Sequence, residues 1–281
     1  MSAAKLAARL GLHRAGREWR GACPCCGYVL SFALSIGRNG RPIAWCASCQ
    51  DQPAVLAALR AAEGGAWQPP AERQPDHDRT EQLRRRALAL WTGAVPVRGT
   101  PAERYLGSRC IGHVAASPAL RFRSDTPHPA GGRLPALLAA VTGPDGGVVA
   151  LHRTYLKRDG GGKASVEPAK ASLGPVHGGA VRLDEAAPEL AIGEGVETAA
   201  AAGKLLGLPA WAAISCGNLA GAVLPALVRS VVIAVDRDEP GERAARAAAW
   251  RWQREGRHVR MMLPDRAGAD ANDVLRERRY A

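Results

Sequence analysis

Two short apolar runs in the C-terminal third of the chain each end directly in acidic residues. The first run, 189–193, is followed by Glu194. The second, 230–235, is followed by Asp236 and Asp238. A short apolar run without polar alternation, followed by a turn and a helical stretch, is typical of a strand buried in a parallel sheet. Because ligands of open α/β sheets bind at the carboxyl ends of the strands, we expect these carboxylates to lie together at one edge.

The alternation of strand-like and helix-like stretches continues to the end of this region. It predicts a mostly parallel α/β layer, with strands at 189–194, 209–215, 230–236 and 258–263 and helices at 197–207, 219–228 and 240–255. The last strand leads into a third acidic turn with Asp270 and Asp273. Acids gathered at one edge repel one another unless a divalent cation lies between them, and oxygen ligands favour Mg²⁺ or Mn²⁺. For each acid taken alone, the alternative is a helix N-cap.

Cysteines are concentrated near the N-terminus, where five of the seven fall between positions 23 and 49. They include two Cys-x-x-Cys pairs, Cys23 with Cys26 and Cys46 with Cys49, on either side of a hairpin-like stretch. Four thiolates with this spacing are typical of one structural zinc ion. The other cysteines are expected to be a bystander to this site or ordinary buried thiols: Cys25, Cys110 and Cys216.

Changes in composition divide the chain into four segments. We predict a zinc-ribbon domain at 1–62, a Pro- and Gly-rich linker with a helix at 63–99, a mixed α+β subdomain at 100–188 and the α/β domain at 189–281. The helix of the linker is expected at 80–94. Thr100, followed by Pro101 and then Glu103, has the pattern of a capped helix start. Further strands are expected at 120–123, 134–141 and 148–156.

The net charge of +12 is unevenly distributed. Segment 101–188 carries eleven basic and seven acidic side chains, whereas 189–281 carries thirteen and twelve. Basic segments beside a nearly neutral one that holds the acids suit a polyanionic partner such as nucleic acid. The alternative is arginine that merely covers solvated faces. With no run of 18 apolar residues and no signal-peptide pattern at the N-terminus, we expect a cytoplasmic protein without membrane contact.

Together the acidic motifs resemble the Toprim domain shared by topoisomerases and bacterial-type primases. That domain has Glu-Gly after one strand, Asp-x-Asp after another and acids in a later turn. The matching residues here are Glu194-Gly195, Asp236 and Asp238, and Asp270 with Asp273. The resemblance implies a Rossmann-like sheet whose catalytic acids are Glu194, Asp236 and Asp238. With Asp270, these acids would hold catalytic Mg²⁺ or Mn²⁺.

The N-terminal half narrows the resemblance to bacterial-type DNA primases. Cys23-Pro-x-Cys26 followed by Ser31-Phe32 is similar to their template-binding zinc ribbon, although the second zinc ligand there is usually His. The stretch from Tyr105 to Arg109 resembles the helix that opens their polymerase domain. Glu-Gly-x-Glu-Thr, beginning at Glu194, is closest to the compact primases of phages, plasmids and other mobile elements. Unlike many of these relatives, the sequence carries neither a helicase-docking domain nor a fused helicase.

The resemblance implies a primase that synthesises short RNA primers on single-stranded DNA from ribonucleoside triphosphates. It would serve the replication of a mobile element together with a separate replicative helicase. Arg153, Lys163 and Lys170 match, more loosely, the basic residues of the polymerase domain that contact nucleotide or template. The two lysines lie in Gly-rich segments that suit phosphate binding, but a β-turn loop of no special function is the alternative.

Three other classes of protein share parts of this pattern. A Toprim nuclease would use the same metal ions to activate water, but it needs neither the zinc ribbon nor the Tyr105 helix. A RecR-like recombination protein would bind DNA without catalysis, but its zinc knuckle follows a helix-hairpin-helix that we do not find. A type IA topoisomerase requires a further large domain for which the chain is too short.

Overall fold

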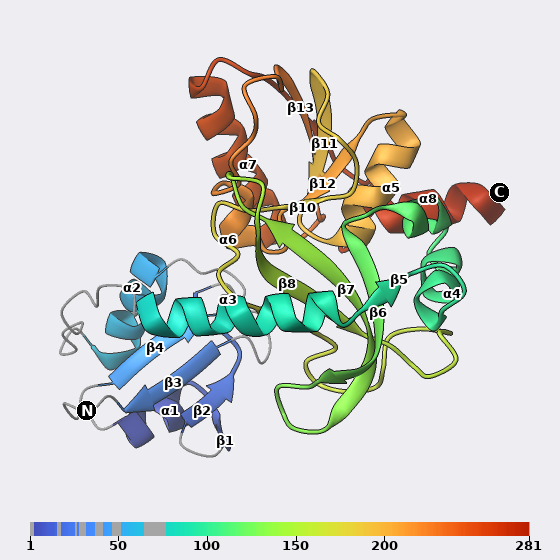
Figure 1. The fold of residues 1–281 in the computed structure, drawn as a ribbon. Helices are drawn as coiled ribbons and strands as arrows, with labels where there is room; N and C mark the ends of the chain where they lie inside the picture. The colour runs from blue at the N-terminus through green and yellow to red at the C-terminus, as the bar shows by residue number, and fades with distance from the viewer. Residues whose placement is uncertain are drawn as a thin grey trace. The chain divides into compact units, whose positions relative to one another are not determined.

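The structure is a computed structural model, and it describes residues 3–15, 18–25, 27, 32–36, 42–46, 52–64 and 77–280. The chain forms two compact units, Met1–Asp76 and His77–Ala281 (Figure 1). Each unit is described by itself. None of the helices in the described parts is long and apolar enough to cross a membrane.

The N-terminal unit is built on a four-stranded antiparallel sheet. Its strands follow chain order: β1 (His13–Ala15), β2 (Glu18–Gly21), β3 (Phe32–Ile36) and β4 (Pro42–Cys46). Two helices, α1 (Ala3–Arg9) and α2 (Gln52–Glu63), complete the unit. The small core is formed mainly by Leu6, Trp19, Phe32, Leu34, Val55 and Leu59.

Two of the four predicted zinc ligands lie in the described part of this unit. Cys23 follows β2 and Cys46 ends β4, and both are buried. The turn after Cys23 is tight, since Cys25 N donates to Cys23 Sγ at 3.4 Å and Gly27 N donates to Cys23 O at 2.8 Å. Cys26 and Cys49 lie outside the described residues. The four-thiolate zinc site therefore stays a prediction.

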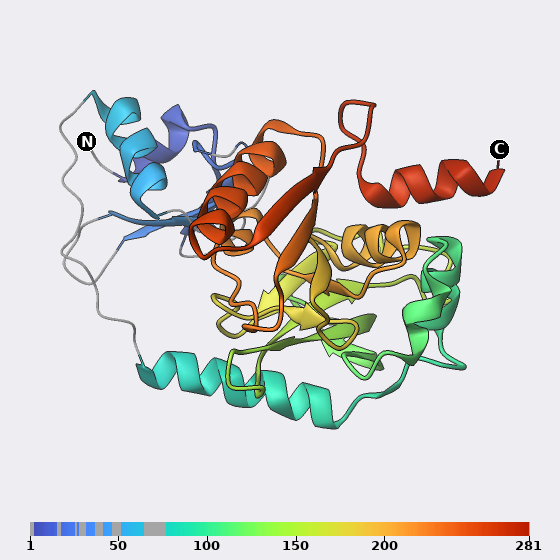
Figure 2. The same ribbon diagram turned by 90° about the horizontal axis from the view of Figure 1, so that it is seen from above.

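The first sheet of the C-terminal unit is antiparallel. Its order is β5 (Val95–Pro96), β6 (Leu120–Pro127), β7 (Arg133–Thr142), β8 (Val148–Tyr155) and β9 (Lys170–Leu173). Helix α3 (His77–Thr92) covers one face, where Ala87 and Trp91 pack on Leu138 and Leu151. The opposite face carries α4 (Pro101–Ser108) and the short 3₁₀ helix η1 (Gly112–Ala116), so the sheet lies between α3 and the rest of the unit (Figure 2).

Several sequence-based predictions are confirmed in this region. Helix α3 corresponds to the helix expected at 80–94, and β6, β7 and β8 correspond to the three expected strands. Thr100 caps α4 by accepting a hydrogen bond from Ala102 N at 3.2 Å, while Glu103 accepts one from Gly99 N at 2.7 Å. The capped start predicted from Thr100, Pro101 and Glu103 is therefore present. Strand β9 was not expected, and it pairs with β8 as an edge strand.

The second sheet of this unit is mostly parallel. Its order is β10 (Val181–Arg182), β12 (Ala210–Ala212), β11 (Glu189–Gly193), β13 (Ser230–Ala234) and β14 (His258–Met262), and only β10 runs antiparallel. Helices α5 (Val196–Leu206) and α8 (Ala271–Tyr280) lie side by side on one face (Figure 1). Helix α7 (Glu239–Arg254) covers the other face, where Trp252 packs with Trp211 and Ile233. Apolar residues of both sheets share one core, which joins them into a single unit.

The helix predicted at 219–228 is wrong. Helix α6 spans only Cys216–Leu219 and is followed by turns. Pro225 disfavours a helix through the C-terminal half of the predicted range, and Gly221 packs so closely on His177 that a Cβ would lie 2.9 Å from Cε1. Strand β10 and helix α8 were not predicted from the sequence, and α8 begins directly after the third acidic turn.

Candidate active site

The predicted acids meet at the carboxyl edge of the parallel sheet. Strands β11 and β13 are neighbours in register, with Gly193 opposite Ala234, so Glu194 and Asp236 follow at the same edge. Asp270 immediately precedes α8 and reaches the same place. These three acids line a pocket with a volume of about 140 Å³.

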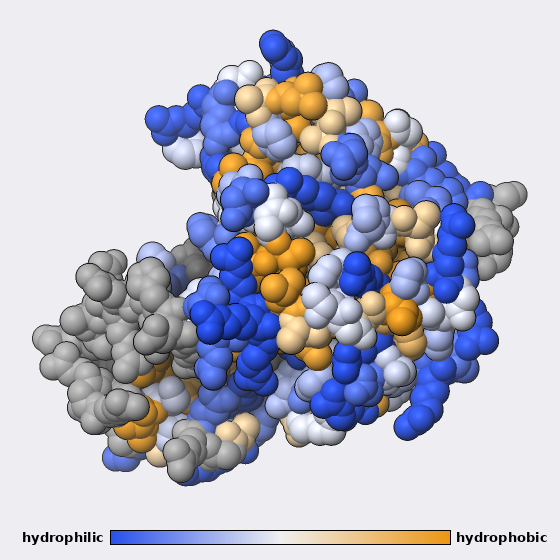
Figure 3. Space-filling view, in the orientation of Figure 1, coloured by the Kyte–Doolittle hydropathy of each residue, from blue (hydrophilic) through white to orange (hydrophobic). Residues whose placement is uncertain are grey.

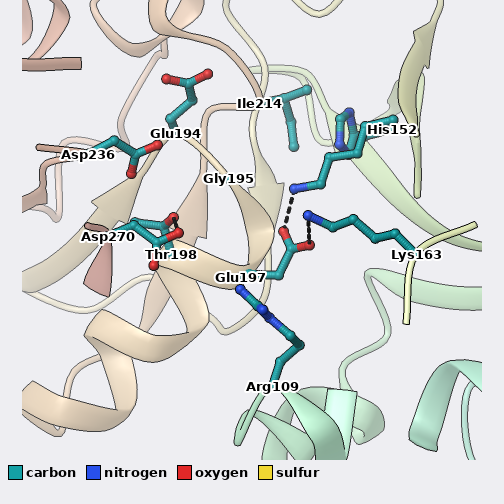
Figure 4. A pocket seen from close by; sticks show the side chains of 11 residues that line it. Arg109, His152, Lys163, Glu194, Gly195, Glu197, Thr198, Ile214, Asp236 and Asp270 are labelled. Carbon is teal, nitrogen blue, oxygen red and sulfur yellow. Dashed lines mark hydrogen bonds and ion pairs between the residues drawn. The ribbon is translucent and has the colours of Figure 1, made fainter. Parts of the chain in front are cut away.

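The pocket has an acidic side and a basic side. Figure 4 shows Glu194, Asp236 and Asp270 on one side and Arg109, His152 and Lys163 on the other. The acids belong to the parallel sheet, whereas His152 lies on β8 and Lys163 in the loop between β8 and β9. Lys170, the first residue of β9, lines the pocket too. The two sheets thus supply opposite charges to one site.

Burial and the charges of neighbouring acids raise the pKa of two carboxyl groups in the pocket. Burial, followed by the charges of Glu194, Asp270 and Asp238, raises the pKa of Asp236 to about 7. Asp236 Oδ1 is buried and, among the residues that the structure describes, has no hydrogen-bond partner. Burial also raises the pKa of Glu194, although Cys216 Sγ donates a 2.6 Å hydrogen bond to its Oε2.

This acidic cluster suits a divalent cation. Carboxylates that raise one another's pKa gain when a positive ion replaces the proton, and the uncompensated Oδ1 of Asp236 is an oxygen ligand of the kind that Mg²⁺ or Mn²⁺ prefers. Within the described residues, no three His, Cys, Asp or Glu side chains are already arranged to hold one ion together. Binding would therefore require small movements of these side chains.

Asp238 and Asp273 have a different role in the structure from the acids that line the pocket. Asp238 Oδ1 caps α7 by accepting from Gly241 N at 2.7 Å, as the N-cap alternative predicted. Asp273 and Asp270 form two reciprocal hydrogen bonds, each from a backbone amide to the other residue's carboxylate. Asp273 N donates to Asp270 Oδ1 at 2.9 Å, and Asp270 N donates to Asp273 Oδ2 at 3.3 Å. Neither Asp238 nor Asp273 is among the residues that line the pocket. Asp238 nevertheless lies near enough to raise the pKa of Asp236.

On the basic side, both predicted lysines contact Glu197. Lys170 Nζ donates to Glu197 Oε2 at 2.8 Å, and Lys163 Nζ lies 3.7 Å from Oε1. Tyr105 donates its hydroxyl proton to Glu197 Oε1 at 2.6 Å. The side chain of Glu197 is only 6% exposed. Although burial raises the pKa of this carboxyl, Lys170 and then Lys163 lower it more strongly, so Glu197 stays ionised.

Arg153, the third predicted basic residue, does not line the pocket. Its guanidinium is buried and donates to the carbonyl oxygens of Pro127 at 3.0 Å, Ala171 at 3.3 Å and Ser172 at 3.1 Å. These bonds tie β8 to the end of β6 and to β9. The neighbouring His152 projects to the pocket instead, because successive residues of a strand face opposite sides.

The sequence reading did not assign Glu197, His152 or Arg109 to the site. Glu197 and Arg109 stood inside motifs that it singled out, so a signal existed for both. His152 had none: it is an ordinary strand residue whose burial, with Lys170 nearby, lowers the pKa to about 3 and leaves the ring neutral. Arg109 ends α4 at the pocket, and its Nε is buried without a hydrogen-bond partner in the described part of the chain.

Comparison with known proteins agrees with this geometry. Residues 189–280 match the Toprim domain family, and residues 81–183 match a domain family of unknown function, DUF7146. The parallel sheet with its edge acids is therefore a Toprim domain, and this third of the chain belongs to that family. No curated protein matches the chain.

Solved structures with a similar fold include the DnaG catalytic core, which is 20% identical over 69% of this chain and 76% of that one, with a TM-score of 0.50. The primase fragment of the bacteriophage T7 primase-helicase protein is 13% identical over 92% of this chain and 95% of that one, with a TM-score of 0.44. The zinc-binding and RNA polymerase domains of the Aquifex aeolicus primase are 14% identical over 99% and 80%, with a TM-score of 0.46. The resemblance to bacterial-type primases is thus confirmed at the level of the fold by the DnaG core.

Proposed function

We propose that the protein is a DNA primase that joins ribonucleotides on a single-stranded DNA template. The observation that carries this proposal is the pocket with two sides of opposite charge. A nucleoside triphosphate held with a divalent cation carries both signs of charge, and it matches acids on one side and lysines on the other. The fold shared with the DnaG catalytic core supports the same conclusion. A role in replicating a mobile element, beside a separate helicase, rests on the Glu-Gly-x-Glu-Thr motif alone.

In the proposed reaction, a 3′-hydroxyl attacks the α-phosphate of the incoming nucleotide. A new ester bond forms, the bond to the β-phosphate breaks, pyrophosphate leaves and the hydroxyl proton is lost to solvent. Glu194, Asp236 and Asp270, with Asp238 after a small rearrangement, would hold Mg²⁺ or Mn²⁺. When bound, the metal lowers the charge on the attacking and leaving oxygens. Lys163, Lys170 and Arg109 would bind and orient the triphosphate.

The face of the C-terminal unit seen in Figure 3 is compatible with a polar ligand. Hydrophilic residues predominate there, and the hydrophobic ones form separate small groups. Polar surfaces rich in basic side chains bind nucleic acid mainly through its phosphates. The hydrophilic character of this face is compatible with the proposed nucleic-acid partner.

The N-terminal unit is proposed to be a zinc ribbon that binds the template. The N–H···S bond from Cys25 to Cys23 and the burial of Cys46 support the ligand set Cys23, Cys26, Cys46 and Cys49. Trp45 supports contact with single-stranded DNA, because 49% of it is exposed and a base can stack on its ring. Elemental analysis should find about one zinc per chain in the protein and in Cys25→Ser, but none in Cys46→Ser.

The test of the function is incubation with single-stranded DNA, labelled ribonucleoside triphosphates and Mg²⁺ or Mn²⁺. New labelled oligonucleotides identify a primase. Shortening of the DNA without new oligonucleotides identifies a Toprim nuclease, and binding without either product identifies a DNA clamp. Either of the last two results would refute the proposal. Asp236→Asn serves as the inactive variant that excludes a contaminating polymerase.

A further inference from the structure

Among the acids of the pocket in the described structure, only Glu197 forms ion pairs with lysines. It is the second residue of α5, and its carboxylate receives a hydrogen bond from Lys170, a longer ion pair from Lys163 and a hydrogen bond from Tyr105. Glu194 and Asp236 contact none of these lysines. A phosphate that enters the pocket must therefore compete with Glu197 for the lysines.

The two lysines are held by Glu197 with different strength. Lys170 makes a 2.8 Å charge-assisted hydrogen bond, and its backbone is fixed because it opens β9 opposite Thr154 of β8. Its ammonium also lies beside the turn after Glu194, 4.0 Å from where a Cβ of Gly195 would be. Charge-assisted hydrogen bonds of this length are about twice as strong as neutral ones. Lys170 is thus firmly placed at the pocket.

Lys163 is held more weakly. Its Nζ lies 3.7 Å from Glu197, beyond hydrogen-bond length, and its side chain is 38% exposed. Its backbone belongs to the loop between β8 and β9, outside the named strands, and pairs with Leu156 through an isolated bridge. Burial and the nearby charge of Lys170 lower the pKa of Lys163, whereas the charge of Glu197 raises the pKa of Lys170 despite burial. Of the two lysines, Lys163 loses less by leaving Glu197.

We propose that Glu197 is a positioning residue that stands in for a phosphate, and that a bound triphosphate takes Lys163 from it while Lys170 stays. This inference rests on the proposed function for the identity of the ligand. Before binding, the carboxylate of Glu197 faces the ammonium groups of Lys163 and Lys170, so these three side chains together carry one net positive charge. After binding, Glu197 still fixes Lys170, and Lys163 is available to the phosphates.

The exchange predicts opposite effects on binding and on synthesis when Glu197 loses its charge. Glu197→Gln leaves two uncompensated lysines, which attract a polyphosphate more strongly, yet neither lysine is fixed for reaction. We expect the affinity for inorganic tripolyphosphate to rise by about threefold to tenfold, and the rate of synthesis at saturating nucleotide to fall by at least about tenfold. A residue that only supports the fold would lower both.

The lysines provide the sharpest test, with Lys157→Ala as a matched control, since Lys157 is exposed on the same loop and does not line the pocket. Calorimetric titration of the full chain with metal-free tripolyphosphate should show about tenfold weaker binding in Lys163→Ala and unchanged binding in Lys157→Ala. Thermal denaturation should show a melting temperature close to that of the wild type for Lys163→Ala and several degrees lower for Lys170→Ala, which leaves Glu197 with the weaker partner.

Two results would overturn the inference: wild-type tripolyphosphate affinity in Lys163→Ala, or weaker binding in a folded Glu197→Gln variant. Glu197→Asp, which keeps the charge, should restore wild-type binding, and this distinguishes lost charge from misfolding. Because tripolyphosphate binding needs no synthesis, the test is separate from the proposed function. The expected binding pattern in a protein that makes no oligonucleotides would refute the primase and retain the exchange for another phosphate ligand.

Discussion

The two sides of the pocket differ in how far their charges are compensated. On the basic side, Glu197 neutralises part of the charge of Lys163 and Lys170 within the protein itself. On the acidic side, burial and then the charge of Glu194 raise the pKa of Asp236, and one oxygen of Asp236 has no hydrogen-bond partner in the described structure. The proposed cation would compensate the acidic side from outside, whereas part of the basic side is compensated by the protein itself.

The largest expected effect comes from removing the charge that this cation would need. Asp236→Asn keeps the shape of the side chain but cannot act as an anionic ligand, so oligonucleotide synthesis should fall at least about a hundredfold. Affinity for single-stranded DNA should change little, because phosphate contacts depend on basic residues elsewhere. Synthesis assays and fluorescence anisotropy on the same preparations measure both. Retained synthesis would remove Asp236 from the catalytic site.

Asp238 tests where the acidic side of the pocket ends, because this residue could serve as a helix cap, as a metal ligand or as both. In the structure it caps α7, and Asn caps a helix as well as Asp does. Asp238→Asn should therefore keep the melting temperature, and under the proposed mechanism it should still reduce synthesis by about tenfold or more. Asp238→Ala, which also removes the cap, should lower stability by about 1 kcal/mol. If Asp238→Asn synthesises at the wild-type rate, Asp238 is a helix cap and belongs to neither side of the pocket.

The acidic side could be predicted from sequence further than the basic side, for a physical reason. Parallel strands bring their carboxyl ends to one edge, so two apolar runs ending in Glu194 and Asp236 suffice to predict their meeting. Glu197 instead binds Lys170 of strand β9 and Tyr105 of helix α4, which lie 27 and 92 positions away in the chain. No local pattern encodes such contacts. The resemblance to primases suggested Lys163 and Lys170, but not the carboxylate that holds them.

Short elements were the least predictable parts of the fold. Strands β9 and β10 have only four and two residues, too few to show a periodic pattern, yet β9 carries Lys170 to the pocket. The helix predicted at 219–228 is absent from the structure. Its apolar residues instead pack into the core from a segment of turns, in which Gly221 packs against His177. Arg153 was assigned to ligand binding by resemblance. In the structure its guanidinium instead ties β8 to the carbonyl groups of two other strands.

A smaller effect is expected at Cys216, whose thiol donates to Glu194 Oε2 at 2.6 Å. Burial, followed by the charge of Glu194, raises the pKa of this thiol, so it stays protonated and remains a donor. Cys216→Ala removes the donor and should slow synthesis by about fivefold, the scale of one net hydrogen bond. Cys216→Ser keeps a donor and should stay within about twofold of the wild type. Equal rates of synthesis in the wild type, Cys216→Ala and Cys216→Ser would show that Glu194 does not need the hydrogen bond from Cys216.

The smallest expected effect is a shift of a few degrees in melting temperature. It compares the acidic and basic sides of the pocket without an activity assay. The pKa of Asp236 is raised from 3.8 to about 7, so the folded state binds its proton more tightly than the unfolded state does. Its contribution to stability is therefore lost as pH rises from about 4 to about 7. For Glu197, whose pKa is lowered, the sign is opposite: its contribution is present above about 4.5 and is lost on acidification.

Metal-free thermal denaturation at two pH values separates these signs. At pH 8, Asp236→Asn should melt about 3 °C or more above the wild type, because a repelling charge is gone, and Glu197→Gln should melt below it. At pH 4 the advantage of Asp236→Asn should disappear, since the wild-type carboxyl is then protonated. Added Mg²⁺ should raise the melting temperature of the wild type at pH 8 and leave Asp236→Asn unchanged, because only the wild type offers the full set of anionic ligands. If the melting temperatures of both variants move in the same direction at pH 8, Asp236 and Glu197 do not have opposite effects on stability, and the contrast between the two sides of the pocket is wrong.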